Sequence, residues 1–481
     1  MTDLHFRSAA AIAEAIRRKD VSSLELTDHF IFRIERMDGA INAVVVRDFE
    51  GARAAARAAD ATLAQGRVIG PLHGVPMTTK ESFDLTGMAT TWGVPAMRNN
   101  IAAQDAEYVR KLKQAGAHFL GKTNVPFNLA DFQSFNDIYG TTNNPWNHTR
   151  TCGGSSGGSA AALAAGFTAL EIGSDIGGSI RNPAHFCGVY GHKPTWNVVS
   201  GQGQGLPGMN APSSIAVVGP LARSAEDLAL SMDLVAGADH NSAGWKLDLP
   251  RPSKQSLKEY RVAIWPTDAH MPVTVEIAER VRGIGDTLRR LGVRVSDTAR
   301  PEIDLDHSNR VYHSLLWGEM SAGMSAAEKA PFRAIVPSLA SDDMSPPALF
   351  MRGALQEHAD WQRANNERFL LRAIWRRFFA DWDILICPIV PTTAFAHDHG
   401  DYLGRRIQVD NASFDYMQQL FWAGQITVAH LPSTVFPTGP AKDGLPIGLQ
   451  AVGAEFNDYI TIDFARLLAR EIGGFTPPPG Y

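Results

Sequence analysis

Apolar segments typical of strands alternate with segments of helical spacing along most of this 481-residue chain. Helices are expected over residues 48–65, 105–114, 159–166, 225–235 and 275–291, and strands over residues 72–83, 117–120, 168–172, 261–265, 384–387, 433–436 and 448–452. A chain that alternates in this way buries its strands between layers of helices. We therefore predict an α/β fold in which helices cover both faces of a mixed central sheet. No linker or internal repeat interrupts the pattern, so we expect a single large domain over residues 1–481.

The composition argues against several classes of protein. A net charge of −5 and a pI near 6.3 do not provide the basic surface that nucleic acids require, so we expect no nucleic-acid partner. The three cysteines, Cys152, Cys187 and Cys387, form no Cys-x-x-Cys pair, which fits a reducing compartment. No stretch approaches the roughly 20 apolar residues of a membrane span, and residues 1–15 lack the pattern of a signal peptide. A cytoplasmic protein without a membrane partner is expected.

Two familiar motifs lie in an unsuitable structural context. Residues 116–123 (GAHFLGKT) match the phosphate-loop pattern, but a predicted helix precedes them and a predicted strand runs through their middle. A phosphate loop needs a strand before the first glycine and a helix after the lysine. Residues 153–157 (GGSSG) match the nucleophile elbow, but the polar residues 143–150 stand where an elbow needs a hydrophobic strand. Neither nucleotide binding nor an α/β-hydrolase site is the favoured interpretation.

Three separated segments are better interpreted together. They are VPMTTK (residues 75–80), GGSSGGSA (residues 153–160) and DIGGSIRNPA (residues 175–184), the last followed by GHKPT at residues 191–195. Their order and spacing resemble the motif of the amidase signature family, which contains both glycine–serine loops and an upstream lysine.

The resemblance divides the expected domain into four parts. Residues 1–65 form an N-terminal helical segment, and residues 70–238 form the signature core, where the match is dense. Residues 239–382, in which no family pattern is recognisable, form a variable and partly helical segment on the substrate side. Residues 383–481 return to the core sheet.

The resemblance implies a chemistry of two serines and a lysine. Ser179 is the expected nucleophile, and Ser155 is the expected bridging serine that passes a proton between Ser179 and Lys80. The two glycines before Ser179 let backbone N–H groups converge on one point. The expected oxyanion hole consists of the backbone amides of Ile176, Gly177, Gly178 and Ser179. These groups would supply the nucleophile, base and oxyanion donors that amide hydrolysis requires.

Lys80 can act as the base only if it loses its charge near neutral pH. Its ordinary pKa of about 10.4 must then fall by more than about three units, a shift that burial can supply. Glu81 would oppose this shift if it lay beside the amine. Because successive side chains of a strand point to opposite faces, we expect Glu81 to face away. The alternative interpretation is that Lys80 forms an ion pair on the surface.

Other polar residues near these motifs are assigned no chemical step. Asp175 and Arg181 bracket the second glycine turn, and we expect them to hold it by hydrogen bonds. His185 and His192 lie near Cys187, but their spacing matches no common metal-ligand motif. We therefore expect no metal and no cofactor.

Aromatic residues gather in residues 312–382, where the substrate side is expected. Those around residues 371–379 follow helical spacing, which predicts an amphipathic helix packed on the core. Residues 312–317 and Phe350 are instead candidates for lining an apolar or aryl amide pocket. Leu129 corresponds, by the resemblance, to a substrate-lining position in membrane-anchored fatty-acid amidases. Leu129 and Ser155 are thus the expected substrate contacts.

Three functions are compatible with these residues. The favoured one is an amidase that hydrolyses the carbon–nitrogen bond of a small neutral amide, aryl or hydrophobic, through an acyl-enzyme on Ser179. Its expected partner is the small-molecule amide, and the resemblance implies a homodimer. The alternative is the A-type glutaminase subunit of a transfer-RNA-dependent amidotransferase, which would need a charge pair for glutamine that the sequence does not reveal. A binding protein without activity is disfavoured, because Lys80, Ser155 and Ser179 are all present.

Overall fold

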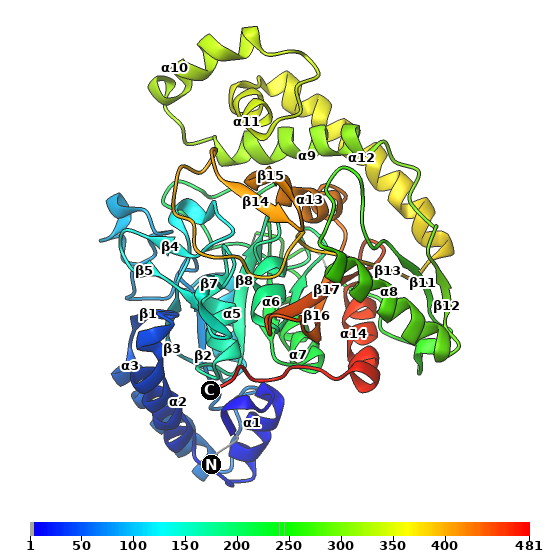
Figure 1. The fold of residues 1–481 in the computed structure, drawn as a ribbon. Coiled ribbons are helices and arrows are strands. Elements are labelled where there is room, and N and C mark those ends of the chain that lie inside the picture. The colour runs from blue at the N-terminus through cyan, green and yellow to red at the C-terminus, as the bar shows by residue number, and fades with distance from the viewer. Residues whose placement is uncertain (1–3, 240, 245) are drawn as a thin grey trace.

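An eight-stranded mixed sheet flanked by helices forms the centre of the computed structural model, which describes residues 4–239, 241–244 and 246–481 (Figure 1). In spatial order its strands are β12 (Arg294–Ser296), β11 (Arg261–Ile264), β13 (Ile384–Cys387), β17 (Pro446–Val452), β16 (Ser433–Pro440), β9 (Tyr190–Lys193), β10 (Val217–Ala222) and β8 (Glu171–Asp175). Strand β11 is parallel to both its neighbours, and the pairs from β13 to β8 are antiparallel. The predicted α/β fold with a mixed central sheet is confirmed.

Helices cover both faces of this sheet. Two pairs pack together: α5 (Gly157–Ala164) with α6 (Arg181–Cys187), and α7 (Ala225–Val235) with α14 (Asp458–Ile472). Thr434 Oγ1 on β16 lies 2.9 Å from Thr461 Oγ1 on α14. The side chain of the next residue, Val435, lies on the opposite face, beside Gly448. A Cβ added at Gly448 would lie 3.2 Å from Val435 Cγ1 and 2.9 Å from the Cα of His185 on α6. Since adjacent residues of a strand point to opposite faces, α6 and α14 lie on opposite sides of the sheet.

A separate three-stranded sheet carries Lys80. Its order is β1 (Val44–Arg47), β3 (His118–Thr123) and β2 (Pro76–Lys80). Strand β2 lies beside β8, the edge of the large sheet. The backbone N–H of Thr78 on β2 donates to the side-chain Oγ1 of Thr168, just before β8, at 2.9 Å. The strand predicted over residues 72–83 is shorter than expected. Its beginning is a turn, closed by a hydrogen bond from Val75 N–H to Leu72 O.

The N-terminal region is mostly helical, and strand β1 lies between two of its helices. It contains α1 (Ala9–Arg17), α2 (Ser23–Met37) and α3 (Phe49–Ala64), and α4 (Glu107–Gln114) follows β2. Ser22 caps α2, and the reciprocal bond from Ser22 N–H to the Glu25 carboxylate completes a capping box. Asp48 caps α3 through a bond from Gly51 N–H.

Residues 133–158 are rich in Asn, Thr, Ser and Gly, a composition that predicts a long loop, but they contain four short strands in two hairpins. These are β4 (Phe135–Asn136) with β5 (Gly140–Thr141), and β6 (Asn143–Asn144) with β7 (Asn147–Thr151). Asparagine side chains close both turns: Asn136 Oδ1 accepts from the N–H groups of Ile138 and Tyr139, and Asn144 Oδ1 accepts from Trp146 N–H. The asparagines that suggested a loop are therefore turn residues of hairpins.

Four helices from the variable segment gather at one end of the molecule, at the top of Figure 1. They are α9 (Leu305–Met320), α10 (Ala326–Ile335), α11 (Pro346–Leu355) and α12 (His358–Asp381). The hairpin β14 (Arg406–Val409) and β15 (Ala412–Asp415) lies beneath them with α13 (Leu420–Val428), whereas α8 (Val275–Arg290) contacts β11 and β12. Leu371, Trp375 and Phe378 of α12 are buried, so the prediction of an amphipathic helix packed on the core is confirmed.

Candidate active site

Lys80 ends strand β2 and is completely buried. Its Nζ lies 2.7 Å from Ser155 Oγ and 2.9 Å from Ser174 Oγ. Burial lowers the pKa of Lys80 to about 7. Three carboxylates oppose this shift, namely Asp175, Glu171 and Glu81. Much of the amine is therefore uncharged near neutral pH and can accept a proton from the serine hydroxyl beside it.

The neighbouring Glu81 is bound to another part of the chain. Its carboxylate accepts hydrogen bonds from the N–H groups of Thr91 at 2.6 Å and Trp92 at 3.0 Å. Glu81 also receives the Tyr139 hydroxyl at 3.2 Å. These partners hold the carboxylate away from direct contact with Lys80, as the alternation along a strand predicts.

Ser155 lies in a tight glycine turn before α5, and its peptide bond to Gly154 is cis. Gly153 has a φ of +89°, and a Cβ there would lie 2.5 Å from Asn182 Oδ1. The same Asn182 oxygen accepts Gly154 N–H at 3.1 Å, and Ser134 Oγ donates to Gly153 O at 3.0 Å. Only glycine fits position 153, both for its backbone conformation and for this close packing.

Ser179 lies in the turn between β8 and α6, beside the loop of Ser155. Ser156 N–H donates to Ser179 O at 3.1 Å, which places the two glycine–serine loops side by side. Ser179 is nearly buried, at 9% exposure, and lines a pocket. No hydrogen bond joins Ser155 Oγ to Ser179 Oγ within the residues that the structure describes. The structure thus pairs Lys80 with Ser155, and the link from Ser155 to Ser179 stays a prediction.

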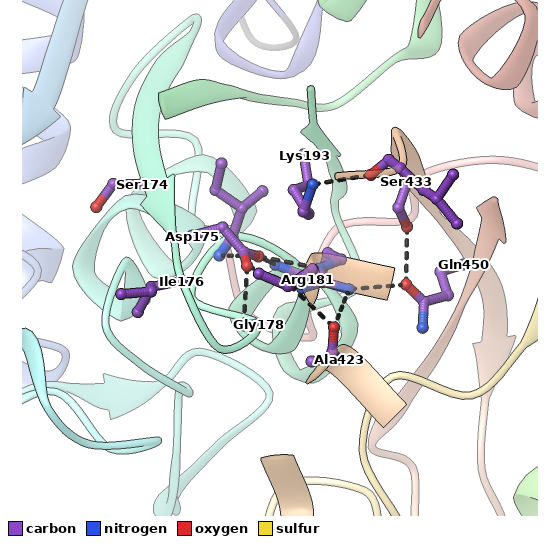
Figure 2. Close-up of polar contacts among 12 residues, drawn as sticks. Ser174, Asp175, Ile176, Gly178, Arg181, Lys193, Ala423, Ser433 and Gln450 are labelled. Atoms are coloured by element: carbon purple, nitrogen blue, oxygen red, sulfur yellow. Dashed lines mark hydrogen bonds and ion pairs between the residues drawn. The ribbon is translucent and has the colours of Figure 1, made fainter. Parts of the chain in front are cut away.

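Asp175 and Arg181 form a fully buried ion pair under this turn (Figure 2). All five N–H groups of the guanidinium are used. Nε donates to Asp175, Nη1 donates to Ala423 O and Gln450 Oε1, and Nη2 donates to Asp175 and Thr427 Oγ1. Burial favours the protonated acid, but Arg181 outweighs that effect and lowers the pKa of Asp175 to about 2. This geometry supports the structural role predicted for the pair.

The expected oxyanion donors are not equivalent. Gly178 N–H donates to Asp175 Oδ1 at 2.9 Å, so this amide is already engaged (Figure 2). The N–H groups of Gly177 and Ser179 donate to no group in the described part of the chain. Of the four predicted amides, Gly178 therefore holds the turn, and the oxyanion role of Ile176, Gly177 and Ser179 stays a prediction.

A mainly apolar pocket opens at Ser179. Its side-chain walls include Leu129, Ile176, Leu316, Trp317, Met320, Tyr402, Met417 and Leu420. Leu129, Leu316 and Trp317 are among these lining residues, and their contact with a substrate stays a prediction. Phe350 instead packs edge-on behind Trp317, with ring centroids 4.9 Å apart. Tyr312 is buried under the turn and donates its hydroxyl to Ile176 O at 3.1 Å.

Among the residues that line this pocket, Asp131 is the one with a charged side chain. Its carboxylate accepts Arg405 Nη1 at 2.7 Å and the Tyr416 hydroxyl at 2.6 Å. The side chains of Asp131 and Arg405 are only 7% and 5% exposed. The charge of Asp131 is therefore neutralised within the wall of the pocket.

The sequence did not predict that Met417 and Leu420, at the start of α13 and just before it, line the pocket, because these residues lie far along the chain from the signature motifs. Ser174 was also missed, although a signal was present: it precedes Asp175 on the strand that leads to Ser179.

Two other groups considered in the sequence have structural explanations. Lys122, the lysine of the segment that matches the phosphate-loop pattern, is buried on β3 and donates to Thr90 Oγ1 at 2.9 Å. Both ring nitrogens of His185 face backbone carbonyls, those of Gly448 and Thr392. Within residues 4–239, 241–244 and 246–481, no group of three or more His, Cys, Asp or Glu side chains could hold a metal ion.

The fold and the lysine–serine arrangement are those of an amide hydrolase. The Amidase family model matches residues 25–462, and the chain belongs to this family. It is 34% identical over 482 residues to a glutamyl-tRNA(Gln) amidotransferase subunit from Roseiflexus castenholzii, covering 95% of this chain and 94% of that protein. It is 32% identical to indoleacetamide hydrolase of Bradyrhizobium diazoefficiens, covering 97% and 86% of the two chains.

The structure of a bacterial aryl acylamidase of the amidase signature family is also similar. It superposes with a TM-score of 0.84 at 25% identity, covering 98% of this chain and 97% of that one. The chain is thus an amidohydrolase of the amidase signature family. In the described part of the chain, no helix combines the length and the apolar character needed to span a membrane.

Proposed function

We propose that this enzyme hydrolyses a small neutral amide with an aryl or hydrophobic group, through an acyl-enzyme on Ser179. One observation carries the proposal: the buried amine of Lys80 lies 2.7 Å from Ser155 Oγ, in the loop that packs against the turn of Ser179.

The proposed reaction has two halves. Lys80 accepts a proton from Ser155, which takes one from Ser179, and the Ser179 oxygen attacks the amide carbon. The amides of Ile176, Gly177 and Ser179 then stabilise the negative oxygen of the tetrahedral intermediate. As the carbon–nitrogen bond breaks, the proton returns through Ser155 to the leaving amine. Water attacks the resulting ester by the same route, which releases the acid and restores Ser179.

The pocket supports a neutral substrate. Its walls are apolar side chains, and the carboxylate of Asp131 is already paired with Arg405. Free glutamine carries an ammonium and a carboxylate, and burying these charges without partners is costly. The similarity to an aryl acylamidase and to an indoleacetamide hydrolase also supports an aromatic group on the substrate.

The second candidate is the glutaminase subunit of a transfer-RNA-dependent amidotransferase. The 34% identity to one amidotransferase protein along 95% of the chain favours it. It would need partner subunits and free charges for glutamine in the pocket. The favoured proposal needs neither, and it includes a homodimer in the cytoplasm without a nucleic-acid or membrane partner.

The test is activity of the purified chain on anilides, aryl acetamides, small aliphatic amides and glutamine. We expect turnover of the neutral amides, little release of ammonia from glutamine, and elution as a dimer in size-exclusion chromatography. The Ser179→Ala variant should lose on the order of 10³-fold or more in kcat, and a fluorophosphonate probe should label Ser179 alone. Ser253→Ala, a change of an exposed serine, is the control.

Two results would contradict this proposal. Normal turnover by Ser179→Ala, or a probe adduct mapped to Ser156, would remove Ser179 as the nucleophile. Efficient glutamine hydrolysis that appears only when the other amidotransferase proteins are added would favour the second candidate.

A further inference from the structure

The segment between β9 and β10 brings a glutamine next to the hydrogen-bonding partner of Lys80. Gln204 Nε2 lies 3.2 Å from Ser174 Oγ and 3.4 Å from Ser82 Oγ. Ser174 Oγ is in turn 2.9 Å from Lys80 Nζ. Figure 2 shows Ser174 directed away from the Asp175–Arg181 pair, so its hydroxyl is available to Lys80 and Gln204.

The backbone immediately before Gln204 is held firmly. Gly203 has a φ of +78°, and a Cβ there would lie 2.5 Å from Ala106 Cα, so the loop packs against the start of α4. Asp84 N–H donates to Gly203 O at 2.8 Å, and Glu107 N–H donates to Gln202 O at 3.0 Å. The position of the Gln204 side chain therefore follows from a docked loop.

Gln204 lies on the solvent side of the candidate base. Lys80 and Ser82 are completely buried and Ser174 is 6% exposed, whereas Gln204 is partly exposed. Water that reached the amine would stabilise its charged form and raise its pKa, so the base depends on a dry surrounding.

We propose that Gln204 is a positioning residue: its amide holds the Ser174 hydroxyl against the Lys80 amine and closes that amine off from water. This inference rests on the proposed function. An uncharged amine has one lone pair, which must accept the Ser155 proton, while its N–H groups need acceptors. Ser174 Oγ provides such an acceptor, and Gln204 occupies the outer side of Ser174, where water would otherwise bind.

The charges that face Lys80 make its protonation sensitive to this contact. Asp175 and Glu171 on β8, and Glu81 after β2, all favour the ammonium form. Arg181 neutralises Asp175. Burial raises the pKa of Glu171 to about 8, so this carboxyl is largely protonated at pH 7. Exclusion of water is therefore what keeps the amine uncharged, and Gln204 contributes to it.

The experiment measures the pH dependence of the rate at which a fluorophosphonate probe labels Ser179, which requires no knowledge of the substrate. Gln204→Met keeps the length of the side chain and removes its hydrogen bonds, whereas Gln204→Glu adds a negative charge near the amine. Gln104→Glu adds the same charge at an exposed position and is the matched control. Melting temperatures verify that the variants fold.

We expect the pH of half-maximal labelling to rise in Gln204→Met by about 0.5–1 unit, which makes labelling about three- to tenfold slower at pH 6. In Gln204→Glu it should rise further, because a carboxylate stabilises the ammonium. Gln104→Glu should behave as the wild type. A half-maximal pH that is unchanged in both Gln204 variants, even with slower labelling at every pH, would overturn the inference. If the wild type is not labelled at Ser179, the proposed function itself fails.

Discussion

Removing one partner of the buried Asp175–Arg181 pair should destabilise the fold measurably. In Asp175→Asn the guanidinium stays in a site of zero exposure and faces a neutral amide in place of the carboxylate, with its other acceptors on Ala423, Gln450 and Thr427. Breaking a buried pair in this way costs about 3–5 kcal/mol. An unfolding entropy of about 2.1 cal/mol/K per residue gives roughly 1 kcal/mol/K for this chain, so the melting temperature should fall by roughly 3–5 °C.

The assay is differential scanning calorimetry of Asp175→Asn, Arg181→Met and the double variant. The double variant removes both charges, so it should lose less than the two single variants together. Asp286→Asn, which removes an exposed partner of Arg289, is the control and should shift the melting temperature by less than about 1 °C. Strictly additive losses, or an Asp175→Asn protein as stable as the control, would refute this account of the turn.

The same pair predicts a dependence of stability on acid. The folded state lowers the pKa of Asp175 from 3.8 to about 2. The contribution of the Asp175 carboxylate to the stability of the fold is therefore present above pH 4 and is lost as the pH falls through about 2. Wild-type stability should decline more steeply than that of Asp175→Asn over this range.

Two further predictions concern activity. Because burial lowers the pKa of Lys80 to about 7, kcat/KM should fall about tenfold per pH unit below pH 7, since the active amine becomes protonated. Lys80→Met should lose most activity, and its remaining activity should not show this decline at low pH. The same decline in the variant would assign the titration to another group. Trp317→Ala should lower kcat/KM for anilides about 10- to 100-fold relative to small aliphatic amides, with the exposed Phe369→Ala as control; equal losses on both substrate types would show that Trp317 does not select the aryl group.

Several features could be predicted from local sequence because they depend on local chemistry. The alternation of strands and helices and the capping box of Ser22 each follow from a few neighbouring residues. The family follows from three motifs whose spacing is preserved. Even the burial of Lys80 could be inferred, because its proposed chemistry requires an uncharged amine.

Other features were not predicted although their partners are close along the chain. Asp175 engages the N–H of Gly178, three residues later, and the backbone path of the turn decides that this amide leaves the expected set of oxyanion donors. The hairpins within residues 133–158 were expected to be a loop, because asparagine is common in both.

The amide chemistry of this protein was determined by its sequence, since the reacting groups lie in short motifs that keep their local geometry. The character of the pocket was decided only by the tertiary structure. It brings together Leu129, Trp317 and Leu420 and pairs Asp131 with Arg405. Residues so far apart in the chain carry no local signal of their contact, because the burial and charge pairing that select a substrate exist only after the chain has packed.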